Sequence, residues 1–202
     1  KDFGAVGDGV TDDTAAIQAA LDIGGVITFD GVNKVYLCKE LIISNDNLTL
    51  KLEENTILVH PSITASKDLI SIQANNVSIE NGKLDGNSEV NGRHLIDVEG
   101  DNASLERLTL LDATSDAIWI PEFGTYGYGD NLIVRDVTIT NPGRHGVLYS
   151  WDGVNYRSSA VFTNVSLSKT TNTNWGLSLA AIKNATITGI KAVDGFAEKV
   201  NL

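Results

Sequence analysis

The chain has 202 residues, enough for one domain with a substantial core, and a formal net charge of −11 from 15 Lys and Arg against 26 Asp and Glu. A phosphate-binding surface needs clustered basic side chains, and none occur, so the composition argues against nucleic acid and anionic membranes as partners. The single cysteine, Cys38, excludes an internal disulfide and is expected to be a small buried side chain. No apolar run is long enough to span a membrane, which predicts no membrane insertion.

The first forty residues predict a short strand, a glycine-rich turn and then one helix. Residues 2–14 are rich in glycine and aspartate, and the stretch that follows them has apolar residues at helical spacing. Thr11 or Asp12 is placed to cap the helix, which we expect over residues 12–21, and the Gly-Gly pair at 24–25 ends it. The expected buried face consists of Ile17, Ala20 and Leu21.

This arrangement resembles the N-terminal segment of the pectate-lyase-like β-helix proteins, in which such a helix covers the end of a solenoid. Residues 25–31 and Tyr36 resemble the first strand pair of that family, with Asp30 where proline is common. The resemblance implies an all-β fold, a single-stranded right-handed parallel β-helix with an N-terminal capping α-helix. It implies one domain, with residues 1–40 as the cap and first strands and residues 41–202 as about five to six coils.

An internal repeat supports a solenoid. Two series of short apolar-polar-apolar tripeptides alternate along the chain, and each series recurs with a period of roughly thirty residues. Their alternation places Ile, Leu and Val in a bore and polar residues outside. A β-sandwich would not require two interleaved series with one shared period. The first series is centred on Thr49, Ser78, Thr109, Thr138 and Ser166, and the second on Ser71, Asp97, Trp119, Leu148 and Ser178. The last residues, 196–202, resemble the middle of a coil, so we expect a longer natural protein.

Two further patterns have structural interpretations. Five Asn-x-Ser/Thr triplets could be glycosylation sites, but all are interpreted as turn residues at the same phase just before or at the start of a strand. The aspartates near the N-terminus do not match a calcium-binding loop, so no metal and no cofactor is expected. The triplets begin at Asn47, Asn76, Asn102, Asn164 and Asn184, and the aspartates are Asp8, Asp12 and Asp13.

The second series carries the candidate site, because side chains on successive coils stack about 4.8 Å apart. Trp119 is predicted to face outward in mid-strand, and Trp151 and Trp175 follow on the next two coils. Indole rings near carboxylates commonly bind sugar rings, although loops or a second subunit could instead cover them. Asp97 and Glu99 lie two residues apart on one strand, hence about 7 Å apart, within the range of an inverting glycosidase pair. Further carboxylates near this column are Asp116, Glu122 and Asp152.

Two segments resemble the polygalacturonase-like glycoside hydrolases. Residues 115–118 resemble their Asn-Thr-Asp-Gly element, and residues 143–146 resemble their Gly-His-Gly element. The resemblance implies catalytic roles for Asp116 and His145 and substrate binding by Arg144. However, the Asp-Asp pair and the Arg-x-Lys of that family are absent, as are the arginine-lysine sites of pectate lyases, and His145 could be only a turn residue.

A long aromatic and glycine-rich loop, residues 122–129, is predicted to overhang the column and to extend its binding surface. Tyr126 and Tyr128 could contact a ligand or pack the loop onto its own coil.

An acidic, low-cysteine β-helix of this kind resembles the shaft of bacteriophage tailspike and tail-appendage proteins. The resemblance implies recognition and cleavage of a host polysaccharide or teichoic acid, most simply by a hydrolase with paired carboxylates. It also implies a homotrimer located in the phage tail. The alternatives are a non-catalytic glycan-binding or structural shaft, and a secreted bacterial polysaccharide lyase or epimerase.

Overall fold

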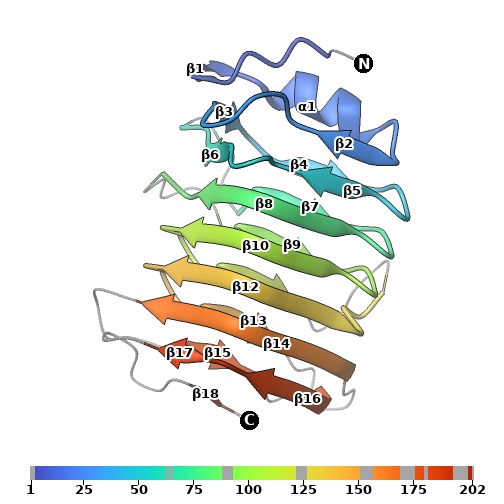
Figure 1. The fold of residues 1–202 in the computed structure, drawn as a ribbon, viewed down its shortest axis with the longest axis vertical. Helices are drawn as coiled ribbons and strands as arrows, with labels where there is room; N and C mark the ends of the chain where they lie inside the picture. The colour runs from blue at the N-terminus through green and yellow to red at the C-terminus, as the bar shows by residue number, and fades with distance from the viewer. Residues whose placement is uncertain are drawn as a thin grey trace.

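The computed structural model describes residues 3–61, 63, 66–87, 93–121, 127–150, 157–168, 176–179, 182–192 and 200–201. It is an all-β parallel solenoid of about six turns with one short helix near the N-terminus, as the sequence predicts. The coils stack along the long axis of the molecule, and the two chain ends lie at opposite ends of the stack (Figure 1).

The strands form two parallel sheets. The long-strand sheet contains β1 (Asp8–Asp12), β2 (Val26–Thr28), β3 (Val35–Cys38), β5 (Thr49–Lys51), β6 (Thr56–Val59), β8 (Ser78–Asp85), β10 (Ser104–Leu111), β12 (Leu132–Thr140), β14 (Arg157–Ser168), β16 (Ile182–Thr188) and β17 (Lys191–Ala192). The short-strand sheet contains β4 (Leu41–Ile43), β7 (Ile70–Ile72), β9 (Ile96–Val98), β11 (Ile118–Ile120), β13 (Val147–Tyr149), β15 (Leu177–Ser178) and β18 (Val200–Asn201).

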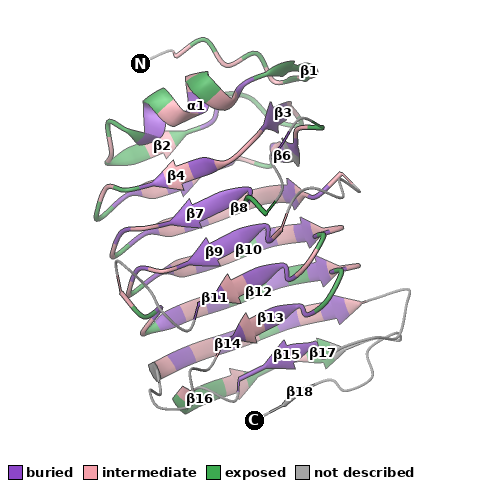
Figure 2. Ribbon diagram, turned by 180° about the vertical axis from the view of Figure 1, so that it is seen from behind, coloured by how far each residue is buried: buried purple, intermediate pink, exposed green. Residues whose placement is uncertain are grey.

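The two sheets enclose one apolar bore. The predicted ladder of the second series is confirmed, because its members pair coil to coil in the short-strand sheet and are fully buried. Figure 2 shows the buried residues along the short strands. The ladder consists of Ile70, Ile96, Ile118, Val147 and Leu177.

Each long strand bends at a residue with positive φ. Asn81, Arg107, Asp136 and Asn164 have φ of 60°, 53°, 54° and 54° and occupy equivalent positions on successive coils. The half of β8 before this bend pairs with β5, and the half after it pairs with β6. A long strand therefore contributes two segments with separate apolar alternations.

This bend explains an error in the predicted first series. The tripeptide centred on Ser78 pairs with Ser104, before the bend, whereas the tripeptide centred on Thr109 pairs with Lys83, after it. The prediction therefore joined two different rows of the sheet. The true spacing between coils is seen in the pairs Ser78–Ser104 and Lys83–Thr109, each 26 residues apart.

Four of the five Asn-x-Ser/Thr asparagines share one phase, as predicted. Asn47, Asn76 and Asn102 have φ of 61°, 58° and 60°, and their side-chain amides bond from coil to coil over 3.1 and 3.0 Å. Asn184 continues that row, because it pairs with Ser159, whose hydroxyl donates to Asn131 of the same ladder. Asn164 is the exception, because it lies at the bend of β14.

The helix α1 (Thr14–Leu21) covers one end of the bore and buries the predicted face of Ile17, Ala20 and Leu21. Its start differs from the prediction, because the N-cap is Asp13, whose side chain makes no capping bond. The Asp13 carboxylate instead accepts the N–H groups of Val6 and Gly7, over 2.7 and 3.1 Å, and so holds the N-terminal segment against the cap.

Candidate functional site

The predicted outward column lies across five strands of the short-strand sheet. Ser71, Asp97, Trp119, Leu148 and Ser178 pair in register on successive coils. Trp119 and Leu148 are half-buried, but the three polar members are buried, so the expectation that polar residues of this series face solvent is wrong here. A buried carboxyl on the outside of a solenoid is costly and requires a compensating interaction.

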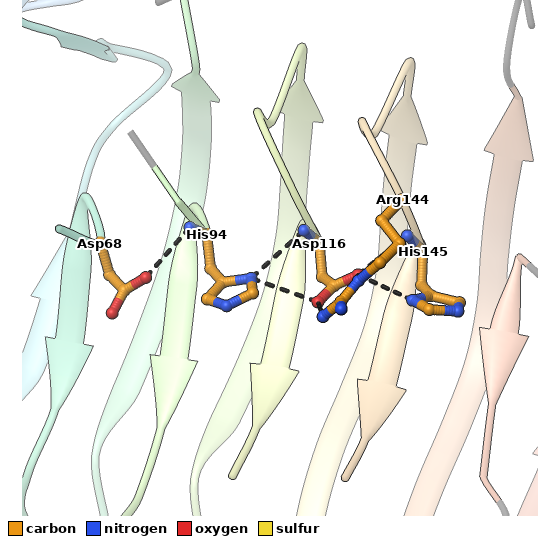
Figure 3. Close-up of polar contacts among 5 residues, drawn as sticks. All are labelled: Asp68, His94, Asp116, Arg144 and His145. Atoms are coloured by element: carbon orange, nitrogen blue, oxygen red, sulfur yellow. Dashed lines mark hydrogen bonds and ion pairs between the residues drawn. The ribbon is translucent and has the colours of Figure 1, made fainter. Parts of the chain in front are cut away.

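A second polar row lies two residues before each short strand, and we call it the polar ladder: Asp68, His94, Asp116 and His145 (Figure 3). Each of the first three members accepts a hydrogen bond from the backbone N–H of the next member. Asp68 Oδ1 accepts from His94 over 3.0 Å, His94 Nδ1 from Asp116 over 3.2 Å, and Asp116 Oδ1 from His145 over 2.9 Å. The ladder therefore fixes the starts of four short strands, β7, β9, β11 and β13, relative to one another.

Sequence reasoning selected Asp116 and His145 but missed Asp68 and His94. The available signal was their constant offset, since each residue precedes the first apolar residue of a second-series strand by two positions.

Asp116 is the best-satisfied charge in the cluster. Arg144 contacts both of its oxygens, with Nε–Oδ1 at 3.0 Å and Nη2–Oδ2 at 2.5 Å, and His145 Nδ1 lies 2.8 Å from Oδ1. Burial raises the pKa of this carboxyl, but the hydrogen bonds from His145 and Arg144 outweigh burial and hold the pKa below its usual range. The Asp116 side chain has no exposed surface and both of its oxygens are already engaged by Arg144 and His145, so we interpret it as a residue that orients its neighbours.

His94 is a neutral side chain with one unsatisfied ring nitrogen. Burial lowers its pKa to about 4, so the imidazole carries no charge at neutral pH. Nδ1 accepts the Asp116 N–H over 3.2 Å and lies 3.3 Å from Asp116 Oδ2, and we assign the ring proton to Nε2 because a backbone N–H already points at Nδ1. Nε2 is buried and has no hydrogen-bond partner in the described part of the chain.

Asp97 is the second residue with an orphan atom. Its side chain is only 5% exposed, and Oδ1 has no hydrogen-bond partner among the described residues. Burial, together with the charges of Asp68 and Glu99, raises the pKa of Asp97 to about 8, although Arg93 opposes this shift. Burial also raises the pKa of Asp68, to about 6. At neutral pH Asp97 is therefore mostly protonated and Asp68 mostly ionised.

Trp119 is not an uncovered platform. The His94 ring stacks on it with centroids 4.8 Å apart and planes inclined by 19°. The Arg93 guanidinium carbon lies over the same indole, 4.2 Å from the ring centroid. Arg93 was not selected from the sequence, where nothing distinguishes it from other surface cations.

The remaining predicted site residues fall into three groups. Glu99 follows β9 and lies near enough to Asp97 to influence its ionisation. Tyr128 is 51% exposed and Arg144 is partly exposed, so both can contact a ligand. The others lie outside the described residues: Glu122, Tyr126, Trp151, Asp152 and Trp175.

The described residues contain no group of three or more His, Cys, Asp and Glu that could hold a metal ion. In the same part of the chain, no helix is sufficiently long and apolar to cross a membrane.

Comparison with known families supports the same fold. Residues 1–39 match the family model of rhamnogalacturonase A/epimerase, pectate lyase-like proteins. Over 44 residues, 21% of this chain, the sequence is 50% identical to a depolymerase of Klebsiella phage K5-2 specific for capsule K30/K69. Over 112 residues, 45% of this chain, it is 31% identical to the plasmin and fibronectin-binding protein A of Streptococcus pneumoniae. The matched stretches span 6% and 15% of these relatives' lengths.

Solved structures share the fold at low sequence identity. A candidate glycosyl hydrolase from Parabacteroides merdae superposes with a TM-score of 0.62 at 20% identity, over 99% of this chain and 97% of that one. The pre-mature gene product 12 of bacteriophage phi29 superposes with a TM-score of 0.64 at 16% identity, over 98% of this chain and 33% of that one. The N-terminal match and the solenoid together make the chain similar in sequence, over residues 1–39, and in fold to the pectate-lyase-like β-helix proteins.

Proposed function

We propose that this chain is part of a phage tail protein that binds and hydrolyses a polysaccharide or teichoic acid of the host cell surface. The observation that carries the proposal is Asp97, a buried carboxyl with an orphan oxygen on the outward column of the short-strand sheet. A carboxyl that stays protonated at neutral pH beside ionised carboxylates is the arrangement that glycosidases use for a general acid.

The proposed reaction uses Asp97 and Glu99 as the pair. Asp97 donates its proton to the glycosidic oxygen as the bond between that oxygen and the anomeric carbon breaks. Glu99, two residues along the same face, accepts a proton from the water whose oxygen bonds to that carbon. Solvent then returns a proton to Asp97 and removes one from Glu99, so the enzyme is unchanged at the end of the cycle.

The surrounding residues would support this pair. Burial, together with the nearby negative charge of Asp68, raises the pKa of Asp97 and so favours its protonated form. Trp119, Tyr128 and Arg144 are the described side chains we propose to contact the glycan. Asp116 and His145 belong to the polar ladder that fixes the strands of the site, and we assign Asp116 a positioning role.

Similarity to the Klebsiella phage depolymerase supports both the substrate class and a location in the virion. We further propose a homotrimer in the full-length protein.

A second candidate is binding without cleavage. The match to the plasmin and fibronectin-binding protein favours it, because that relative covers 45% of this chain, about twice the share of the depolymerase match. In that case the outward column would be a binding surface, and the raised pKa of Asp97 would have no catalytic use.

The test incubates the full-length protein with purified host-envelope polysaccharides and measures product size and mass. Hydrolysis adds the mass of one water per bond cleaved, whereas a lyase yields an unsaturated product without it. Asp97→Asn should reduce turnover by about 10²–10⁴-fold while glycan binding persists. Asp30→Asn, an exposed carboxylate at the N-terminal cap, is the matched control. Binding without any cleavage by the wild type would favour the second candidate.

A further inference from the structure

Arg93 differs from the other arginines whose side chains are described. Arg107 and Arg135 form ion pairs with glutamates on the long-strand sheet, and Arg144 forms one with Asp116. The Arg93 guanidinium makes no hydrogen bond or ion pair with any described residue, and it lies instead over the face of Trp119. A cation that stacks on an indole retains its hydrogen-bonding edge for another partner.

The surroundings of Arg93 place that edge at the candidate site. Its positive charge lowers the pKa of both Asp68 and Asp97, so it lies within electrostatic reach of both carboxyls. Yet neither carboxyl is close enough to form an ion pair with it. Arg93 is therefore held at the site by stacking while its charge lacks a direct counterion in the described part of the chain.

The next residue, His94, independently indicates a missing acceptor. Its ring contacts the same indole as Arg93, and its buried Nε2–H has no partner among the described residues. Figure 3 shows that the ring nitrogen bonded to the Asp116 backbone faces that residue, whereas the other nitrogen points away from it along the strand direction. Two adjacent residues thus present hydrogen-bond donors that no described group accepts.

We propose that Arg93 and His94 bind an anionic group of the ligand, a carboxylate or a phosphodiester, so that the site selects acidic glycans. This inference rests on the proposed function and specifies its substrate class. A carboxylate or phosphate supplies acceptor oxygens without donors, which matches a guanidinium edge and an imidazole N–H. A neutral sugar hydroxyl offers a weaker acceptor and leaves the Arg93 charge without a counterion.

The position of the pair gives it a role in specificity. An anion bound by Arg93 would lie next to Trp119, which pairs in register with Asp97, the proposed acid, on the neighbouring coil. The charged sugar or phosphate would therefore occupy a site close to the bond that is cleaved. The chain's net charge of −11 would repel an anionic polymer elsewhere, which makes this local pair of donors decisive for its binding.

The test measures binding and cleavage of purified host-envelope polysaccharides by the full-length protein. Each polysaccharide is used native, with its uronates reduced to neutral sugars, and after removal of its phosphodiesters. Polygalacturonate, poly(glycerol phosphate) and neutral dextran serve as defined probes. The variants are Arg93→Gln, Arg93→Lys and His94→Gln, with Arg135→Gln on the other sheet as the matched control. Circular dichroism and melting curves establish that each variant folds.

We expect Arg93→Gln to weaken binding of the native anionic glycan about 10–100-fold, as for loss of a charge-assisted hydrogen bond, and Arg93→Lys to restore part of it. Arg93→Gln should not change binding of the neutralised glycan. Sensitivity to carboxyl reduction identifies a uronate, and sensitivity to dephosphorylation identifies a phosphodiester.

Two outcomes separate this inference from the proposed function. Wild-type binding and cleavage of the neutralised glycan as strong and as fast as those of the native anionic glycan would overturn the inference and leave hydrolysis intact. Arg93-dependent binding of an anionic glycan without cleavage would overturn hydrolysis and support the inference. An Arg93→Gln variant that binds native and neutralised glycans as the wild type does also overturns the inference.

Discussion

The outer faces of the two sheets carry charge in opposite ways. On the long-strand sheet, five partly exposed side chains alternate in sign across four strands and pair with one another, with Lys51–Glu80 at 3.6 Å, Arg107–Glu106 at 3.1 Å and Arg135–Glu106 at 3.6 Å. Arg107 also contacts Glu80. Each of these charges is partly exposed and has a neighbour of opposite sign within ion-pair distance.

On the short-strand sheet the charged groups are buried and only partly compensated. Asp97 and His94 each retain an orphan polar atom, and the pKa values of Asp68, His94 and Asp97 are displaced by burial. The fold of a solenoid depends mainly on its inward-facing residues. Outward positions can therefore carry solvated side chains that cost little free energy, as on the long-strand sheet. A costly outward cluster on one sheet alone therefore indicates function.

The largest effect should come from breaking the best-compensated buried charge. Asp116→Ala leaves the Arg144 and His145 donors without their acceptor and should lower the free energy of unfolding by about 3–5 kcal/mol. Because the pKa of Asp116 is lowered in the fold, its stabilising contribution is present above the unfolded pKa near 4 and is lost as pH falls below it. Chemical denaturation at pH 7 and at pH 3 measures both values. An equal difference from the wild type at the two pH values would contradict this assignment.

Truncating a residue of the bore should lower stability through loss of packing, without a dependence on pH. Ile118→Ala deletes a fully buried member of the ladder between β9 and β13 and should cost about 2–5 kcal/mol by loss of burial and formation of a cavity. Because Ile118 contacts no titratable group in this ladder, the cost should not change between pH 5 and pH 8. Urea denaturation at both values measures it, and a cost below about 0.5 kcal/mol would mean that the site tolerates the cavity unusually well.

Asp97 should make stability fall as pH rises. Its pKa in the fold, about 8, lies well above the ordinary value of about 4 for a solvated aspartate, so the fold favours the protonated form. The stabilisation is therefore complete at low pH and decreases as pH rises toward 8, by at most about 1.4 kcal/mol per pH unit. Because the pKa of Asp68 is also raised, to about 6, Asp97→Asn should remove the part of this slope between about pH 6 and pH 8. A wild-type slope that persists in the variant would assign it to another group.

The pH dependence of the proposed glycan cleavage should reveal the electrostatic coupling between Asp68 and Asp97. Asp68→Asn removes a negative charge that raises the pKa of Asp97, so that pKa should fall. The rate of glycan cleavage, which requires protonated Asp97, should then decline at a pH lower than in the wild type by about one unit. A pH–rate profile of kcat/KM measures this limb. An unchanged limb with a reduced maximum would indicate that Asp68 acts only in packing.

The short-strand sheet was predictable because each strand has three residues with a strict alternation between turns. Ile118, Trp119 and Ile120 leave no other phase, and the register of this series was predicted correctly. The long strands were ambiguous because the bend at Arg107 restarts the alternation within β10. Gly82 concealed the second alternation in β8, where a side chain would clash, since an added Cβ would lie 2.3 Å from Leu52 Cβ.

The site was predictable only in its outward-facing members. Asp97 and Trp119 could be placed by alternation, and Asp116, Arg144 and His145 by resemblance to a family. The burial of Asp97 and the orphan nitrogen of His94 depend on residues from neighbouring coils more than twenty positions away, including Asp116 and Trp119. No local pattern reports such contacts. Arg93 was missed for the same reason, because it is distinguished only by the absence of an ion pair with any described residue.

The smallest effect should come from the ion-paired outer face of the long-strand sheet. Arg107→Gln removes the central cation between Glu80 and Glu106, yet all three side chains are solvated. Surface ion pairs of this kind contribute about 0–1 kcal/mol, and salt screens them further. The variant should therefore unfold within about 1 kcal/mol of the wild type at low salt, and closer at about 1 M salt. Its glycan binding should be unchanged, because the long-strand sheet faces away from the polar ladder. A loss of binding in Arg107→Gln comparable to that in Arg93→Gln would show that the functional face had been assigned to the wrong sheet.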